Sequence, residues 1–403
     1  METIEREVRF HNHGMLGAWL IGEEEIEECT EVLRSRSPFR HYGIDLKHKA
    51  RTFEAEAAAA LGASGALAVN SGTSALSCAM AALRLSPGDE VIVPACTFVA
   101  TANAVVLAGG IPVFAEIDGS LGLDPESTAE RITPRTVGII PVHLQGMPCR
   151  IGDIVSLARA RGLWVVEDAA QAFGASAQGR ALGTHGDIGV YSLQAHKTIT
   201  CGEGGLLVTD DETLLRRARA YQDQGGLREG DDYPTWDAPE SGFGHNMKIS
   251  ELHAAVALAQ VRRLPVIRER MRALHALVAS NADLGGRMMR LDHDPSGSLP
   301  YAFILFARDA GDRTRIIEQL DEQGIPADGL YGEAIYRLRP FVRWANGEHV
   351  PGLPHPELRP EFRPCPRSEE LMQRIVRIPL NPAYEPEDMM MLARMLTAIL
   401  HNA

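Results

Sequence analysis

The feature that most constrains this chain is a regular alternation of short apolar segments with helical segments between residues 53 and 209. Strands that alternate with helices form parallel βαβ units, whose crossover helices cover both faces of one sheet. The expected strands lie at residues 66–70, 90–94, 111–117, 136–144, 163–166, 188–192 and 206–208. The pattern therefore predicts an α/β fold built on a mostly parallel, doubly wound sheet.

The chain has 403 residues, more than one small core normally serves, so a second domain is expected. Beyond residue 262 the pattern changes to strands at 301–307 and 374–380 and helices at 312–324 and 386–400, which indicates an α+β unit. We therefore expect a large domain at 1–262 and a smaller C-terminal α+β domain at 263–403. One helix is expected to begin at Ser250 and a second to run from Leu264 to about Ala279.

The composition narrows the class of protein. The net charge of −13, from 40 basic and 53 acidic residues, argues against a general affinity for nucleic acid or anionic membranes. The six cysteines are scattered without zinc-ligand spacing, and no apolar stretch is long enough for a signal sequence or a membrane span. The methionine run 389–391 is interpreted as core packing rather than a metal site. These patterns predict a reduced, cytoplasmic protein without a metal.

Residues 183–205 place a lysine where a reactive group is useful. The apolar run that begins at Ile188 ends at Ser192, Lys197 follows five residues later, and glycines then turn the chain. Loops after strand ends carry the reactive groups of α/β proteins, and glycines let the backbone approach a ligand closely. Lys197 therefore fits a Schiff-base lysine, with Ser192 available to hold a phosphate. The alternative is a solvated surface lysine before a glycine-rich turn.

A second candidate site lies where the strand at 66–70 meets the following helix. Ser71, Gly72 and Thr73 stand at the N-terminus of that helix. Free N–H groups, hydroxyls and the positive end of the helix dipole make such a turn a good phosphate site. An ordinary helix N-cap explains the same residues, because serine and threonine are common capping residues.

Polar and aromatic residues follow other expected strands. The strand at 163–166 delivers Glu167 and Asp168 at its carboxyl end, where ligands collect on such sheets. A carboxylate beside a pyridine nitrogen keeps that nitrogen protonated, although either residue could instead cap the next helix. Phe98 fits a residue that stacks on a ring or one that packs in the core, and Gln171 could reach a ring hydroxyl or face solvent.

Taken together, these motifs resemble the DegT-type sugar aminotransferases, a branch of the fold type I family that depends on pyridoxal 5'-phosphate. The resemblance spans nearly the whole chain. Its motifs occur in family order as NSGTSAL (70–76), VIVPACTFVATANAV (91–105), PVFAEID (112–118), PVHLQG (141–146), VVEDAAQAFGA (165–175), GDIGVYSLQAHKTITCGEGG (186–205) and GHNMKISELHAA (244–255).

The resemblance implies a role for each matching residue. Lys197 is expected to form the internal aldimine and Asp168 to pair with the pyridine nitrogen. Gln171 is expected near the 3-hydroxyl of the ring and Phe98 on its face. The residues expected to hold the phosphate are Gly72, Thr73 and Ser192, with Asn246 reaching it from the neighbouring subunit. The last role implies a homodimer with shared active sites, and the N-terminal segment 1–50 is expected near the site.

The implied reaction is a ping-pong transamination. Glutamate or glutamine is expected to donate the amino group, and a keto or aldehyde group of a nucleotide-linked sugar, a sugar acid or a cyclitol to accept it. Arg228 and Arg337 are candidates for binding the donor carboxylate, and residues 1–50, 225–245 and 330–350 for forming the acceptor pocket.

Other readings of the same motifs stay open. Related sugar dehydratases carry a histidine in place of the lysine, and His196 precedes Lys197 here, but the spacing from Ser192 favours Lys197 and hence a transaminase. A pyridoxal phosphate enzyme with a non-sugar acceptor, a dehydratase-like protein and a regulatory pyridoxal phosphate protein are the alternatives.

Overall fold

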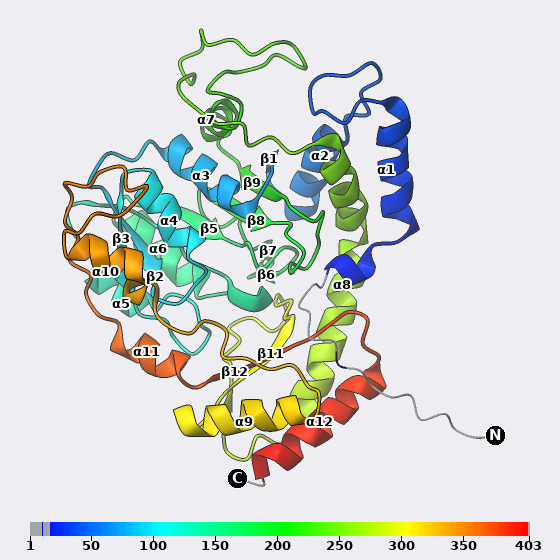
Figure 1. The fold of residues 1–403 in the computed structure, drawn as a ribbon, viewed down its shortest axis with the longest axis vertical. Coiled ribbons are helices and arrows are strands. Elements are labelled where there is room, and N and C mark those ends of the chain that lie inside the picture. Colours follow the sequence, from blue (N-terminus) through cyan, green and yellow to red (C-terminus); the bar gives the residue numbers. More distant parts are fainter. Residues whose placement is uncertain (1–9, 11–16, 402–403) are drawn as a thin grey trace.

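The computed structural model describes Phe10 and residues 17–401. Its centre is a seven-stranded sheet in the order β1-β9-β8-β5-β4-β2-β3 (Figure 1). The strands are β1 (Gly65–Val69), β2 (Glu90–Pro94), β3 (Ile111–Ala115), β4 (Thr136–Ile139), β5 (Trp164–Asp168), β8 (Ile188–Ser192) and β9 (Gly205–Thr209). Each expected strand of the large domain is present, although several end earlier or later than expected.

The sheet is mostly parallel. The pairing is parallel between β8 and β5, β5 and β4, β4 and β2, and β2 and β3. Strand β9 runs antiparallel to both of its neighbours, β8 and β1. The predicted α/β fold is confirmed. The carboxyl ends of β1, β2, β4, β5 and β8 therefore share one edge of the sheet, because β1 and β8 both oppose β9.

Helices cover both faces of this sheet. On β1, Ala66 and Ala68 belong to one apolar cluster and Leu67 and Val69 to another, because successive strand side chains point to opposite faces. The first cluster includes residues of α2 (Lys49–Leu61), α6 (Ile151–Ala160) and α8 (Glu251–Asn281). The second includes residues of α3 (Gly72–Leu83), α4 (Ala100–Leu107) and α7 (Glu212–Gln222). This is the doubly wound arrangement.

The C-terminal part is α+β. An antiparallel sheet in the order β10-β11-β12 is formed by β10 (Met288–Met289), β11 (Ala302–Phe306) and β12 (Ile375–Pro379). Helices α9 (Ala310–Glu322) and α12 (Pro386–His401) lie beside it in Figure 1. Met389 of the methionine run is fully buried.

The remaining elements are distributed along the whole chain. They are α1 (Glu23–Ser35), α5 (Pro125–Glu130), α10 (Arg339–Ala345), α11 (Pro366–Met372), β6 (Ser176–Ala177), β7 (Arg180–Ala181), η1 (Gly17–Leu20), η2 (Leu144–Gly146) and η3 (Ile335–Arg337).

One expectation about the helices was wrong. The two helices expected from Ser250 and from Leu264 are a single helix, α8, which continues through Pro265. Proline inside a helix costs about 3 kcal/mol, but Leu264 and Ile267 on either side of it are buried, and this packing offsets the cost. The expected boundary between residues 262 and 263 therefore lies inside α8, which runs beside both parts of the molecule in Figure 1.

None of the helices in the described part of the chain is long and apolar enough to cross a membrane.

Candidate active site

Asp168 is the last residue of β5, at the edge of the sheet where the parallel strands end. Its buried carboxylate accepts hydrogen bonds from Thr101 Oγ1 at 2.8 Å and from the Ala170 N–H at 3.1 Å. Burial raises the pKa of this carboxyl, and the Thr101 hydroxyl, the Ala170 N–H and the Lys197 charge oppose the rise. Asp168 is thus a buried acid whose ionised form needs a cationic partner.

The preceding residue, Glu167, has a structural role. Its carboxylate is completely buried and accepts hydrogen bonds from the Gly183, His185 and Gly186 N–H groups and from His143 Nε2 at 3.0 Å. These contacts hold the loop that leads into β8 against β5. Neither Glu167 nor Asp168 caps a following helix, because residues 169–175 form turns and no helix.

Lys197 lies in the turn after β8, where the Lys197 N–H donates to Gln194 O at 2.9 Å. The Gly17 N–H donates to Lys197 O at 3.0 Å, so one residue of the N-terminal segment contacts this turn. Most of segment 1–16 lies outside the described residues. Burial and the Arg377 charge lower the pKa of Lys197, and Asp168 opposes them. A lowered pKa favours the neutral amine, which is the nucleophilic form of a lysine.

The expected phosphate residues surround the N-terminus of α3. Ser71 caps the helix, since its side chain accepts the Ser74 N–H at 3.0 Å. Gly72 follows, and a Cβ there would lie 2.8 Å from Ser192 Cβ. Thr73 is exposed beside it. Gly72 and Ser192 are therefore brought together, and only glycine fits at position 72.

Gln171 is the centre of a hydrogen-bond network that the sequence analysis did not anticipate. Its Oε1 accepts from the Gln145 N–H at 3.1 Å, from Gln145 Nε2 at 2.9 Å and from Tyr301 OH at 3.1 Å. Its Nε2 donates to Tyr331 OH at 3.0 Å. Gln145 has a φ of 50°, in the left-handed region that residues other than glycine rarely adopt, and such strain is common at functional sites.

Phe98 and Asn246, like Thr73, are expected site residues that are exposed. Phe98 lies in the turn before α4, where its carbonyl accepts the Thr101 N–H at 3.2 Å, and its side chain is 57% exposed. Asn246 lies in the segment between α7 and α8 and pairs through the backbone with Asp223. Both side chains are open to a further molecule.

Neither arginine candidate lies in the cluster around Lys197. Arg337 is an exposed residue that pairs with Glu369, its Nε 2.7 Å from Oε1. Arg228 pairs with Asp223 and donates to Tyr42 OH at 2.7 Å. The arginine that acts on Lys197 is Arg377 of β12, a residue that the sequence analysis missed.

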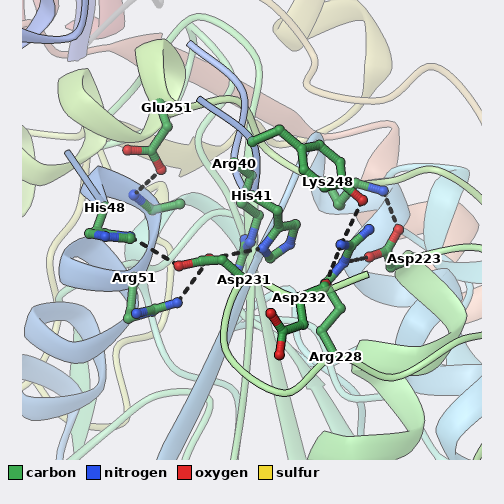
Figure 2. Close-up of polar contacts among 12 residues, drawn as sticks. Arg40, His41, His48, Arg51, Asp223, Arg228, Asp231, Asp232, Lys248 and Glu251 are labelled. Carbon is green, nitrogen blue, oxygen red and sulfur yellow. Dashed lines mark hydrogen bonds and ion pairs between the residues drawn. The ribbon is translucent and has the colours of Figure 1, made fainter. Parts of the chain in front are cut away.

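Arg228 instead lines a separate cavity of about 300 Å³, formed by the segment before and within α2 and by the end of α7 with its following loop. Figure 2 shows its polar contacts: the Asp231 carboxylate pairs with Arg51 at 3.0 Å and lies 3.4 Å from His41 Nδ1 and 3.7 Å from His48 Nδ1. The expected pocket segments 1–50 and 225–245 thus do meet. Of the expected segment 330–350, Tyr331 lies in the Gln171 network instead.

Pyridoxal phosphate, the cofactor that the resemblance implies, fits the residues around Lys197 and Asp168. A buried acid suits the pyridine nitrogen, and an amine with a lowered pKa suits the aldehyde. A Cβ at Gly205 would lie 2.3 Å from Ser71 O, so glycine lets β9 pack closely against the N-terminus of α3, an end of a helix that suits a phosphate.

Comparison with known proteins agrees with this geometry. Residues 20–397 match the model of the DegT/DnrJ/EryC1/StrS aminotransferase family. A UDP-N-acetyl-3-dehydro-α-D-glucosamine 3-aminotransferase of Acidithiobacillus ferrooxidans is 32% identical over 359 residues, which cover 89% of this chain and 90% of that protein.

Solved structures are similar as well. DesI in the presence of its TDP-sugar product is 28% identical with a TM-score of 0.81, over 98% of this chain and 94% of DesI. NtdA of Bacillus subtilis with the bound cofactor PMP is 26% identical with a TM-score of 0.78, over 98% of this chain and 86% of NtdA. With a family model that matches nearly its whole length, this chain belongs to the DegT/DnrJ/EryC1/StrS aminotransferase family.

Proposed function

We propose that this enzyme transfers an amino group from glutamate or glutamine to a keto or aldehyde group of a nucleotide-linked sugar. The observation that carries the proposal is that Asp168, the last residue of β5, and Lys197, which follows the end of the neighbouring parallel strand β8 by five residues, lie at the same edge of the sheet. The UDP-sugar relative and the TDP-sugar complex of DesI support a nucleotide-linked acceptor.

Bound pyridoxal phosphate supplies an aldehyde that takes up the amino group and a ring that takes up an electron pair. Lys197 would hold the cofactor through its amine and would move the proton between the donor carbon and the cofactor. Asp168, oriented by Thr101, would keep the ring nitrogen protonated. Gln171, held by Gln145, Tyr301 and Tyr331, would bind the ring hydroxyl.

The phosphate is held in this proposal by Gly72, Thr73 and Ser192, with Phe98 on the ring face. The exposed Phe98 side chain and the free N–H groups of the first turn of α3 support these roles.

We place Asn246 in the active site of a second subunit, so that the enzyme is a homodimer with shared sites. Asn246 is exposed within a segment that also exposes Tyr233, Trp236 and Phe243. Clustered exposed aromatic side chains mark protein interfaces.

We also propose a cytoplasmic location for the enzyme. All six cysteines are free in the structure, which supports a reducing compartment.

The absorbance spectrum of the purified protein tests this function, recorded before and after addition of L-glutamate or L-glutamine. We expect a visible band from bound pyridoxal phosphate that the donor converts to the pyridoxamine form, and no catalytic conversion in a Lys197→Ala variant. Absence of the band in the presence of added pyridoxal phosphate would refute the assignment of that cofactor. A band that no amino acid shifts would favour a dehydratase-like or regulatory protein.

A further inference from the structure

Gln145 has a backbone conformation that glycine adopts more easily. Its φ of 50° lies in the left-handed region, where a Cβ is sterically disfavoured. The turn around it is held on both sides. The buried Arg290 donates from Nη1 to Leu144 O at 2.9 Å, and the Leu299 N–H donates to Gly146 O at 2.8 Å. A strained residue with a long side chain in such a turn points to a use for that side chain.

The backbone and the side chain of Gln145 contact the same atom. Both donate to Gln171 Oε1, the backbone N–H at 3.1 Å and Nε2 at 2.9 Å. Tyr301 OH donates to this oxygen as well, at 3.1 Å. Both glutamines are buried, with exposed fractions of 4% and 7%. The donors therefore converge on one amide oxygen that is shielded from solvent.

The direction of this network follows from the donors that cannot be reversed. A backbone N–H is always a donor, so the atom of Gln171 that faces the Gln145 N–H must be the oxygen. At the end of its own side chain, Gln145 Oε1 accepts from Arg377 Nη1 at 3.5 Å. Because a guanidinium has no acceptor, Gln145 must turn its Nε2 toward Gln171. Each amide is thereby held in one of its two orientations.

The fixed orientation leaves one hydrogen of Gln171 without an acceptor. Gln171 Nε2 has two hydrogens, and one is donated to Tyr331 OH at 3.0 Å. The structure shows no acceptor for the other within the described part of the chain. Gln171 is the residue that would bind the ring hydroxyl of pyridoxal phosphate, so this N–H is available to that oxygen.

We propose that Gln145 is a positioning residue, which holds the Gln171 amide so that its N–H rather than its oxygen faces the 3-hydroxyl of bound pyridoxal phosphate. This inference rests on the proposed function. A donor that faces a phenolic oxygen favours the ionised form of that oxygen and so lowers the pKa of the hydroxyl. Without the Gln145 side chain the amide is free to turn over, and its carbonyl then disfavours the ionised form.

The test is a pH titration of the absorbance of the bound cofactor. Gln145→Gly keeps the backbone N–H, suits the left-handed conformation and removes the side-chain donor. We expect it to raise the midpoint of the titration by about one pH unit. Gln145→Met, which has a similar volume and no donor, is expected to raise it as well. Both variants retain the charged and titratable groups around the network, which are Asp168, Lys197, Arg290, Tyr301, Tyr331 and Arg377.

Gln178→Gly is the matched control. Gln178 has a similar backbone conformation, with a φ of 52°, but it is exposed and its N–H donates to Asp294 Oδ2 at 2.8 Å. The same chemical change is thus made outside the network, and the midpoint is expected to equal that of the wild type.

A double variant shows whether Gln145 acts through Gln171. Gln171→Met alone is expected to raise the midpoint, because it removes the N–H itself. Adding Gln145→Gly to Gln171→Met is expected to cause no further shift, since the group that Gln145 positions is already absent.

The outcomes separate this inference from the function on which it rests. If the wild type shows the cofactor band and neither Gln145 variant moves the midpoint, Gln145 does not position Gln171, while the transaminase function stands. An equal shift in Gln178→Gly, or a further shift in the double variant, would also overturn the inference. If the wild type gives no cofactor band with added pyridoxal phosphate, the function and the inference fall together. Should Gln145→Gly lose its cooperative thermal unfolding, the midpoint of Gln145→Met decides.

Discussion

The two polar regions of this enzyme differ in how their charges are neutralised. In and beside the cavity that Arg228 lines, carboxylates and cations are matched. Arg40 pairs with Glu54 at 2.5 Å, and Figure 2 shows Asp223 paired with both Arg228 and Lys248. In the cluster around Lys197, the Asp168 carboxylate is met by a hydroxyl and an N–H. The Lys197 amine makes no hydrogen bond to any side chain in the described part of the chain.

This contrast agrees with a structural role for the charges of the first region and with the proposed catalytic role for Asp168 and Lys197. A matched pair keeps its members ionised and fixes two segments together. A buried charge without a full partner has a shifted pKa, which is how catalytic acids and bases are prepared. The raised pKa of Asp168 and the lowered pKa of Lys197 are shifts of the kind expected for the catalytic roles proposed for them.

The largest expected effect comes from Lys197→Ala. Removing the proton-transferring amine is expected to slow turnover by roughly a thousandfold or more, with little change in the melting temperature, because the amine makes few contacts. Single-turnover kinetics with L-glutamate measure the loss. Turnover within tenfold of the wild type would show that the chemistry does not depend on Lys197.

Asp168→Asn comes next. The amide has the same shape but cannot balance a protonated ring nitrogen, so turnover is expected to fall by roughly a hundredfold. Thr101→Val, which removes the hydroxyl that orients Asp168, is the companion variant and is expected to lose less. If Asp168→Asn and Thr101→Val had equal, small effects, Asp168 would be a structural residue.

Asp223→Asn tests the matched region. It leaves the Arg228 and Lys248 charges without their shared, mostly buried partner and is expected to lower the free energy of unfolding by about 2 kcal/mol. Urea unfolding followed by circular dichroism measures this change. Unaltered stability would mean that the matching in Figure 2 contributes nothing to the fold.

The charge of Arg377 predicts a shift with pH. A nearby cation disfavours the ammonium form, so Arg377 lowers the pKa of Lys197, and Arg377→Gln is expected to raise it. Because only the neutral amine attacks an aldehyde, the acid limb of the pH profile for cofactor loading should then move to higher pH. Arg377→Lys keeps the charge and is expected to leave the limb in place, so a shift in that variant would argue against an electrostatic cause.

Asp231→Asn is expected to have the smallest effect. Its partner Arg51 is exposed, and ion pairs in contact with solvent contribute less than about 1 kcal/mol. The same urea unfolding experiment applies. A loss of unfolding free energy as large as that of Asp223→Asn would show that Asp231 stabilises the fold as much as Asp223 does.

The sequence alone predicted the parts of the fold that have local signals. Alternating apolar runs predicted every strand of the large sheet, and Gly72, Asp168 and Lys197 each follow a strand that the pattern marks. The single helix α8 was missed because Pro265 normally ends a helix, and only tertiary packing overrides that rule.

The C-terminal contributors to the site could not be found in the same way. Tyr301, Tyr331 and Arg377 lie more than a hundred residues after Gln171 in the sequence, and contacts over such a separation leave no periodic pattern. One weak signal exists: Arg377 interrupts the apolar strand RIVRIPL, although its meaning depends on which face of the sheet it occupies.

The reversed strand β9 has a consequence for how the lysine is ordered. The loop of residues 193–204 begins after Ser192 and ends before Gly205, and these two residues pair with each other across β8 and β9. Gly205 also pairs with Val69, the last residue of β1 before the turn into α3. The loop that carries Lys197 is thus closed at its base and tied there to the residues proposed to hold the phosphate. Its conformational entropy is lost when the protein folds, so little of it remains to be lost when a ligand binds.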